Sequence, residues 1–246
     1  MMSEKSKKAE ELSQEKEVSA QPAAEQGGAS GDPNKIIPSF LENKFADFTY
    51  RFVKYVPETV HPNVVTGIGI IGGLIGGFSF FLGTFSRWFF LLGILGLITH
   101  IVCDNFDGYM ARNRNQKSQR GGFFDLTSDI VVCTVTALCI GLSSYAHMEV
   151  LAFGAPIYGI HMVITMHYVM YYNEFPFPPF GPFEIHCAYV LIAILNIIFG
   201  EVELFWIGDF PVMLDDIVLF PAIVGAILYA IKFGMDLFFR LKKEGR

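Results

Sequence analysis

The sequence is poor in charged residues and in the side chains that build disulfide or zinc sites. Charged residues make up 17% of its 246 residues, whereas a soluble domain normally carries about 25%. The cysteines lie in or beside apolar segments without metal-ligand spacing, so we expect free thiols: Cys103, Cys133, Cys139 and Cys187. The histidines form no ligand set, and there is no Gly-x-Ser-x-Gly elbow, P-loop or Cys-x-x-Cys pair. These absences argue against a soluble domain, a zinc protein and a P-loop enzyme.

Apolar residues, by contrast, are abundant. They make up 52% of the chain, and aromatic residues alone account for 15%. A helix needs about 20 apolar residues to cross a bilayer. The apolar segments near this length are 64–82, 88–103, 121–142, 150–171, 185–198 and 217–239. They predict an all-α, polytopic membrane protein with about six transmembrane helices, and we assign residues 61–246 to this transmembrane domain.

Two segments of different character precede the first span. Residues 1–35 are rich in Glu, Lys, Ser, Ala, Gln and Gly and contain no aromatic residue, so they predict a disordered tail. Residues 36–60 carry apolar side chains at three- and four-residue spacing, namely Leu41, Phe45, Phe48, Phe52 and Tyr55. This pattern predicts an amphipathic helix. Next to a membrane span, such a helix is expected to lie in the interface with its aromatic face in the lipid.

Glycines crowd the first predicted span. They include two overlapping pairs at four-residue spacing, Gly72 with Gly76 and Gly73 with Gly77. In a membrane, small residues at this spacing allow two helix backbones to approach closely. The pattern predicts a helix packed deep in the bundle or at the seam of a homodimer.

Four aspartates lie between the second and third predicted spans. On a helix, one face is shared by Asp104, Asp107, Gly108 and Ala111, and another pair at i and i+4 is formed by Asp125 and Asp129. Ionisable side chains at a membrane boundary are expensive unless something neutralises them, so they indicate a functional site. Hard oxygen donors without Cys or His ligands favour Mg²⁺ or a similar cation. The alternative is that these acids are ordinary helix caps and solvated loop charges.

The pattern D-x2-D-G-x2-A-R-x8-G-x3-D-x3-D resembles the CDP-alcohol phosphatidyltransferase family. Its fixed positions are met at Asp104, Asp107, Gly108, Ala111, Arg112, Gly121, Asp125 and Asp129. The resemblance covers residues 62–129 well and the rest loosely. It implies an enzyme of phospholipid synthesis that moves a substituted phosphate from a CDP-linked alcohol to the hydroxyl of a second alcohol and releases CMP.

This chemistry suggests roles for the residues of the pattern. Two divalent cations, Mg²⁺ with Mn²⁺ as an alternative, would bridge the pyrophosphate, held by Asp104, Asp107, Asp125 and Asp129. The resemblance also makes Asp129 the general base that takes the proton of the acceptor hydroxyl. The expected nucleotide-binding residues are Asn63, Thr66, Asp104, Gly108, Ala111, Arg112, Ser118 and Gly121.

Several of these residues have plainer explanations that the sequence leaves open. Asn63 follows Pro62 at the start of the first span and could simply cap that helix. Gly108 and Ala111 could serve only helix packing. Arg112 offers a forked donor for phosphate oxygens, but it could also belong to the basic residues that flank membrane spans.

The basic residues favour one orientation. They follow the second span at Arg112, Arg114, Lys117 and Arg120, and the sixth span at Arg240, Lys242, Lys243 and Arg246. The connection at 201–216 contains acids but neither Lys nor Arg. An even number of spans separates the two basic clusters, so they share a side. The positive-inside rule then places both termini, the tail and the aspartates at the cytoplasmic face.

The resemblance leaves the direction of transfer open. The Asp-Asn-x-Asp-Gly opening and the segment Gly181-Pro182-Phe183-Glu184 are similar to choline and ethanolamine phosphotransferases, which favours CDP-ethanolamine or CDP-choline as donor and diacylglycerol as acceptor. That group has a His after the third aspartate, where this chain has Leu126, and its eukaryotic members are longer. The alternative donor is CDP-diacylglycerol, with inositol phosphate, glycerol phosphate, serine or a similar polar alcohol as acceptor. A second alternative is a membrane scaffold or transporter with an acidic ion site. No nucleic acid is expected among the partners.

Overall fold

The computed structural model describes residues 34–35, 40–176 and 182–245. By its contacts the chain divides into two units, Met1–Asn34 and Lys35–Arg246, and all the described helices lie in the second. The predicted disordered tail lies outside the described residues except at its last two positions, and Gly181 also lies outside them.

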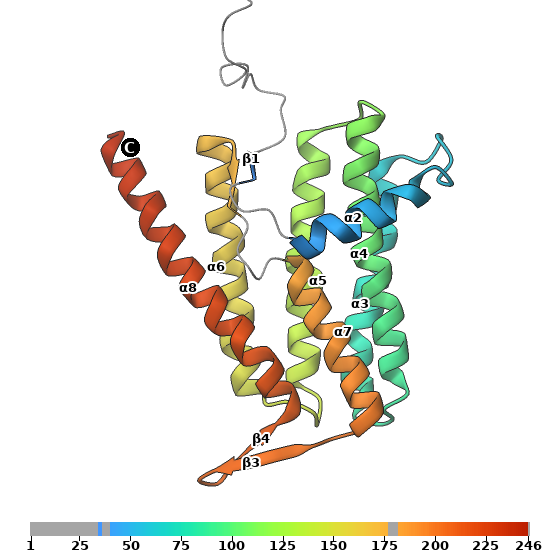
Figure 1. The fold of residues 1–246 in the computed structure, drawn as a ribbon, viewed down its shortest axis with the longest axis vertical. Helices are drawn as coiled ribbons and strands as arrows, with labels where there is room; N and C mark the ends of the chain where they lie inside the picture. Colours follow the sequence, from blue (N-terminus) through green and yellow to red (C-terminus); the bar gives the residue numbers. More distant parts are fainter. Residues whose placement is uncertain (1–33, 36–39, 177–181, 246) are drawn as a thin grey trace, which may run out of the picture. The chain divides into compact units, whose positions relative to one another are not determined.

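Helices make up most of the described chain. They are α2 (Phe40–Val53), α3 (Pro62–Gly83), α4 (Phe89–Asn113), α5 (Gln119–Gly141), α6 (Met148–Tyr172), α7 (Pro182–Phe199) and α8 (Leu214–Lys243). The strands are short: β1 (Asn34–Lys35), β2 (Glu174–Phe175), β3 (Glu203–Ile207) and β4 (Phe210–Met213). Figure 1 shows the long helices running roughly side by side.

Five of the described helices, α3, α4, α5, α6 and α8, are long and apolar enough to cross a membrane. The prediction of an all-α, polytopic membrane protein is therefore confirmed. The predicted count of six spans is not, because the fifth predicted span corresponds to α7, whose apolar part, Phe183–Phe199, is shorter. The α4–α5 connection and the C-terminal end of α8 lie at the same end of the bundle (Figure 1), as the even number of predicted spans required.

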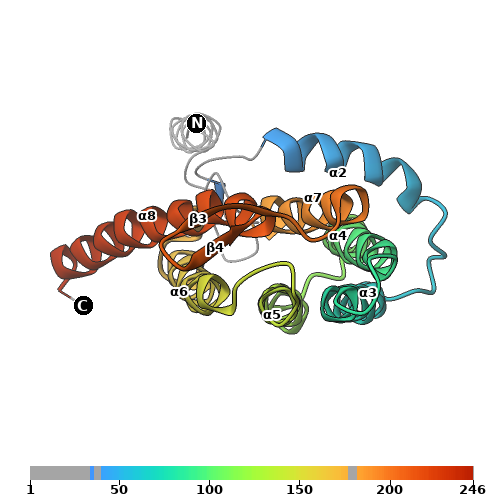
Figure 2. The ribbon, with the colours of Figure 1, turned by 90° about the horizontal axis from the view of Figure 1, so that it is seen from below.

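The six helices from α3 to α8 form a ring. Helix α3 contacts α4 and α5, α4 contacts α7, α7 contacts α8, α8 contacts α6, and α6 contacts α5. Seen along the helices, α6, α5 and α3 form one row and α8, α7 and α4 the other (Figure 2). A contact between α5 and α7 crosses the ring. It separates a half that carries the predicted site from a half that contains an apolar cavity.

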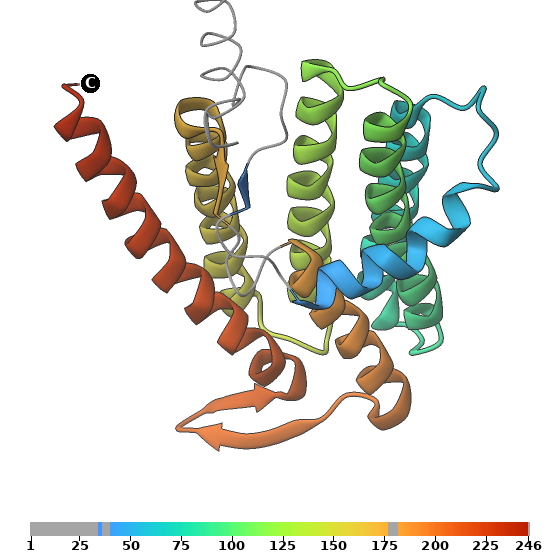
Figure 3. The ribbon, with the colours of Figure 1, turned by 45° about the horizontal axis from the view of Figure 1, so that its top comes forward.

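Helix α2 crosses the bundle instead of running along it (Figure 3). It contacts α4 and α7, and the rings of Phe45 and Phe183 are 5.2 Å apart. On its inner face Thr49 and Val53 are buried, whereas Phe48 and Phe52 on the same helix are 56% and 46% exposed. A helix is present over Phe40–Val53, part of the predicted segment 36–60, with aromatic side chains facing outward. Its position in the membrane interface stays a prediction.

The glycines of α3 bring its backbone against α4 and α5. A Cβ atom added at Gly76 would lie 2.9 Å from the backbone nitrogen of Leu97, and one at Gly73 would lie 2.7 Å from Cγ1 of Val132. These contacts explain the glycine pattern by packing within the chain. The homodimer inferred from the same pattern stays a prediction.

The connection between α7 and α8 contains secondary structure that the sequence did not predict. It contains an antiparallel hairpin in which Phe205 pairs with Val212 and Trp206 with Pro211. Its turn includes Gly208, whose φ of 63° favours glycine. The strands are too short to show a clear alternation of apolar and polar residues, so the sequence pattern did not indicate them.

Candidate active site

Two neighbouring helices bring three carboxylates together. Asp104 and Asp107 lie near the end of α4, and Asp125 lies in the second turn of α5. One carboxylate oxygen from each of the three lies within 4.8 Å of the other two. Asp107 is buried, and the other two are half-buried. The predicted convergence of these acids is therefore present in the structure.

These three residues fit a divalent cation. Carboxylates this close repel one another and lose hydration when buried, so a positive charge between them is strongly favoured. Oδ1 of Asp125 is buried and, within the described part of the chain, accepts no hydrogen bond. Such an orphaned oxygen, in a set made only of oxygen donors, is typical of a site for a hard cation such as Mg²⁺.

Thr66 fixes one of these carboxylates. Its Oγ1 donates a hydrogen bond to Oδ2 of Asp107, and both side chains are buried. Thr66 lies in the second turn of α3, so this bond ties α3 to the site on α4. The sequence assigned Thr66 to the nucleotide, whereas its contact in the structure is with a predicted metal ligand.

The N-terminal ends of α3 and α5 meet beside the carboxylates. The N-cap of α3 is His61, whose Nδ1 accepts from the backbone N–H of Asn63 at 3.2 Å. Asn63 is therefore not the cap that the sequence allowed. Its Oδ1 lies 3.3 Å from where a Cβ atom at Gly121 would be. Ser118 caps α5, with its Oγ accepting from the N–H of Gly121 at 3.0 Å. Two helix N-termini this close favour phosphate oxygens.

Arg112 lies over the glycine that follows Asp107. A Cβ atom at Gly108 would lie 3.3 Å from Nη1 of Arg112. Nη2 of the same guanidinium donates to the hydroxyl of Tyr50 on α2 at 3.1 Å. Ala111 is half-buried on α4, one residue before Arg112. Helix α2 thus supports an exposed arginine next to the predicted nucleotide positions.

Arg114 has a contact that the sequence did not indicate. Its guanidinium donates to the backbone carbonyls of Val56 at 2.9 Å, Val60 at 2.9 Å and Pro57 at 3.3 Å. These carbonyls belong to the connection between α2 and α3. Arg114 therefore anchors this connection, although in the sequence it looked like one more basic residue flanking a span.

Asp129, which the sequence placed among the metal ligands, is not one of the three acids whose oxygens lie within 4.8 Å of one another. Its Oδ1 is 3.3 Å from Nε2 of His100 on α4. The side chain of His100 is 3% exposed and that of Asp129 is 13% exposed. Sequence reasoning missed His100 because it searched for histidines at ligand spacing from one another. The usable signal was its position four residues before Asp104, which places both on one face of α4.

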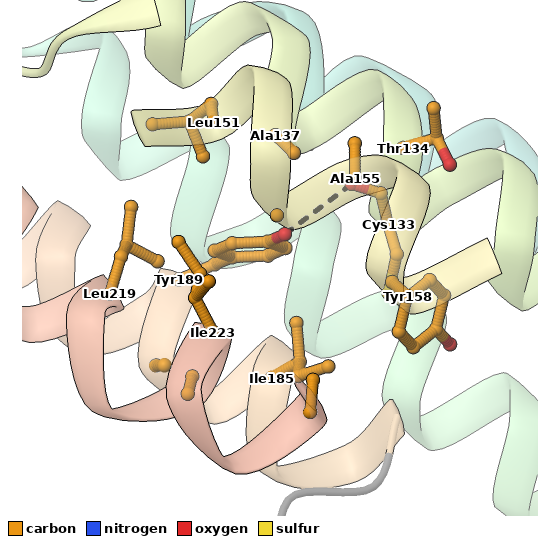
Figure 4. Close-up of a pocket in the computed structure, with 14 residues that line it drawn as sticks. Cys133, Thr134, Ala137, Leu151, Ala155, Tyr158, Ile185, Tyr189, Leu219 and Ile223 are labelled. Carbon is orange, nitrogen blue, oxygen red and sulfur yellow. Dashed lines mark hydrogen bonds between the residues drawn. The ribbon is translucent and has the colours of Figure 1, made fainter. Parts of the chain in front are cut away.

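An apolar cavity begins where this face of α5 continues into the bundle. One and two turns beyond Asp129, Cys133 and Ala137 line a cavity of about 40 Å³ between α5, α6, α7 and α8. Figure 4 shows Tyr189 and Tyr158 at its wall, with the hydroxyl of Tyr189 donating to the carbonyl of Cys133 at 3.4 Å. The same helix therefore presents carboxylates at one end and an apolar hollow farther along.

The sequence was compared with models of known protein families and with curated proteins. A family model described as CDP-alcohol phosphatidyltransferase matches residues 59–232. This range contains every residue predicted for the site, from Asn63 to Asp129. A comparison with curated proteins found no match.

Proposed function

Because the chain belongs to the CDP-alcohol phosphatidyltransferase family, we propose that it transfers a substituted phosphate from CDP-ethanolamine or CDP-choline to diacylglycerol and releases CMP. The convergence of the Asp104, Asp107 and Asp125 oxygens within 4.8 Å carries the transfer reaction, whereas the choice of donor rests on the Asp-Asn-x-Asp-Gly opening and the Gly181-Pro182-Phe183-Glu184 segment. A CDP-linked alcohol contains a pyrophosphate, and such a group needs concentrated positive charge to be held beside carboxylates.

The three carboxylates are the proposed ligands of two divalent cations, Mg²⁺ or alternatively Mn²⁺. When bound, these ions neutralise charge on the attacking and leaving oxygens of an in-line displacement. Around them, Arg112 offers a forked donor to phosphate oxygens. Gly108 and Gly121 keep side chains out of the space next to Arg112 and Asn63. Thr66 holds Asp107 in place.

Asp129 is the proposed general base. It lies one helical turn beyond Asp125 on α5, outside the group of three. In the reaction, the acceptor oxygen forms a bond to phosphorus while the bond from phosphorus to the CMP oxygen breaks. The proton of the acceptor hydroxyl passes to the Asp129 carboxylate.

The position of the apolar cavity supports a lipid acceptor. Cys133 and Ala137 continue the face of α5 that carries Asp129, and they line the cavity between α5 and α8. A lipid that enters from the bilayer side could place its hydroxyl at Asp129. The cavity of about 40 Å³ is smaller than an acyl chain, so its lining side chains would have to move to admit one. The nucleotide would then arrive at the other end, which we propose is the cytoplasmic one from the positive-inside rule.

One observation favours the alternative donor, CDP-diacylglycerol with a small polar alcohol as acceptor. Leu126 occupies the position after the third aspartate, and it packs against an apolar cluster of Cys133, Tyr158 and Met162. The His that choline and ethanolamine phosphotransferases have at this position is therefore absent, and this chain has no second proton acceptor there.

The two donor classes are separated by one assay on the full chain in lipid nanodiscs. With Mg²⁺ present, CMP release is measured from CDP-ethanolamine or CDP-choline plus diacylglycerol. A parallel reaction contains CDP-diacylglycerol plus inositol phosphate, glycerol phosphate or serine. Turnover of the first donor class alone is expected. Turnover of the second alone overturns the proposed direction, and release from neither favours the scaffold or transporter.

A further inference from the structure

His100 occupies a position between three helices. Its ring extends from α4, and it lies against α3, where a Cβ atom at Gly73 would be 3.1 Å from its Cγ and one at Gly69 would be 3.6 Å from its Nδ1. The approach at Gly73 is tighter than ordinary contact, so a side chain there would press on the imidazole, whereas the distance at Gly69 is an ordinary van der Waals contact. Gly73 therefore makes room for a ring whose opposite nitrogen, Nε2, lies 3.3 Å from Oδ1 of Asp129.

A second buried imidazole, from α7, lies beside the first. The rings of His100 and His186 are 4.7 Å apart with an interplanar angle of 46°. Both ring nitrogens of His186 lie within 3.8 Å of the sulfur of Cys133, which is one helical turn beyond Asp129 on α5. Each of these three side chains, His100, His186 and Cys133, belongs to a residue that is 2% exposed. Helices α3, α4, α5 and α7 together restrict the His100 ring to one place.

We propose that His100 is a positioning residue for Asp129, with His186 holding the His100 ring in place. This inference rests on the proposed function, in which Asp129 accepts the proton of the acceptor hydroxyl. In it, the Nε2–H of His100 donates to Oδ1 of Asp129. This bond fixes the carboxylate and leaves Oδ2 to receive the proton. In the structure these atoms are 3.3 Å apart but are not aligned as a hydrogen bond, and such contacts in catalytic sites commonly shorten and align when substrate binds.

His161 on α6 provides a matched comparison. It is 1% exposed, and its ring is stacked on that of Tyr229 with centroids 4.1 Å apart. It is as deeply buried as His100, but it packs on aromatic rings, Tyr229 and Tyr158, instead of facing an aspartate. A purely packing role for a buried histidine in this bundle would make the two residues equivalent.

The test compares kcat and KM for CMP release in four variants: His100→Leu, His100→Gln, His186→Leu and His161→Leu. We expect His100→Leu to lower kcat by about 10- to 100-fold, the usual effect of losing an orienting partner. The KM for the CDP-linked donor is expected to stay within about twofold, because the donor contacts other residues. His100→Gln should recover most of kcat, since its amide N–H reaches a similar position. His186→Leu should lower kcat less than His100→Leu.

Asp129→Asn, alone and combined with His100→Leu, completes the experiment. If His100 acts through Asp129, the double variant should be no slower than Asp129→Asn alone. If His100→Leu does not fold in detergent, the inference is tested by whether His186→Leu lowers kcat more than His161→Leu does. The inference is overturned if His100 or His186 variants keep the wild-type kcat, if they lose no more than His161→Leu, or if the losses in the double variant add. Full turnover in Asp129→Asn would instead overturn the proposed base, which separates the two failures.

Discussion

The molecule carries buried acids at both ends of its bundle, and the two groups differ in their hydrogen-bond partners. At the start of α8, Asp216 accepts hydrogen bonds from the backbone N–H groups of His147 at 3.1 Å and Met213 at 3.0 Å, and it pairs with Nδ1 of His147 at 2.7 Å. Its neighbour Asp215 accepts from Nδ2 of Asn196 at 2.9 Å. At the other end, Asp104, Asp107 and Asp125 face one another.

This contrast shows that burial alone does not distinguish a structural acid from a functional one. Asp107 and Asp216 are each 5% exposed. The acids near α8 join α6, α7 and the β3–β4 hairpin through donors that the chain itself supplies, and among the described residues only Oδ1 of Asp215 in this pair is left without one. The acids on α4 and α5 converge on a point where the chain supplies mainly other carboxylates. Carboxylates that face one another repel unless a cation or a shared proton lies between them, so the second group fits a cation in a way that the first does not.

The largest effect is expected from Asp125→Asn. This change removes the carboxylate with the orphaned buried oxygen, and CMP release should fall by at least about 100-fold, as for loss of a group that stabilises transition-state charge. Cation-free thermal stability should stay equal or rise, because repulsion between like charges decreases. Assays and melting curves of the same preparation measure both. A variant that loses stability and keeps its activity would place Asp125 with the structural acids.

The second expected effect is stabilisation by Mg²⁺. At a concentration about 100 times the dissociation constant, a cation that binds only the folded protein adds about 2.7 kcal/mol to the free energy of unfolding. The melting temperature of the wild type should therefore rise with Mg²⁺ and fall back with EDTA. Asp125→Asn should lose most of this response, whereas a variant of Asp216 should keep it. An equal response in both variants would mean that Mg²⁺ binds elsewhere.

The sequence predicted the site end of the bundle better than the far end, because the site residues lie close together in the sequence. Asp104, Gly108 and Ala111 lie on one face of one helix, and Asp125 and Asp129 on one face of the next, so helical periodicity alone groups each set. The adjacent apolar spans then indicate that the two sets lie at a membrane boundary. The all-α membrane fold followed from apolar segment length in the same way.

Contacts between distant segments could not be predicted. Asp216 binds His147, which is 69 residues away, and Arg114 binds carbonyls more than 50 residues before it. His186 reaches His100 only because α7 packs on α4, a pairing that no spacing indicates. The β3–β4 hairpin was missed because its strands are short. The fifth predicted span corresponds to α7, whose apolar part is shorter than the other spans, so the count of six stays a prediction.

A smaller effect is expected from Asp216→Ala at the far end. The change leaves two backbone N–H groups and the His147 ring without their acceptor, which should cost about 2 kcal/mol of stability. The kcat should remain within about twofold of wild type, because these contacts lie at the opposite end of the bundle. Asp209→Ala removes the same charge from an exposed position in the β3–β4 turn, and it should change neither quantity. If Asp216→Ala instead abolishes CMP release in folded protein, the two groups of acids are coupled and the contrast between them fails.

The smallest effect is expected from Tyr50→Phe, which tests whether α2 belongs to the site. The hydroxyl of Tyr50 accepts from Nη2 of Arg112 at 3.1 Å, and the aromatic rings of Tyr50 and Tyr109 remain in contact at 4.2 Å without it. A single hydrogen bond of this kind contributes about 1 kcal/mol. If it orients Arg112 toward phosphate, KM for the CDP-linked donor should rise about threefold to fivefold with kcat nearly unchanged. Tyr55→Phe, at a position that is 71% exposed just beyond α2, should leave both constants unchanged. A loss of melting temperature without a change in KM would show that Tyr50 only attaches α2 to α4, and Arg112 would then need no help from α2 to reach its ligand.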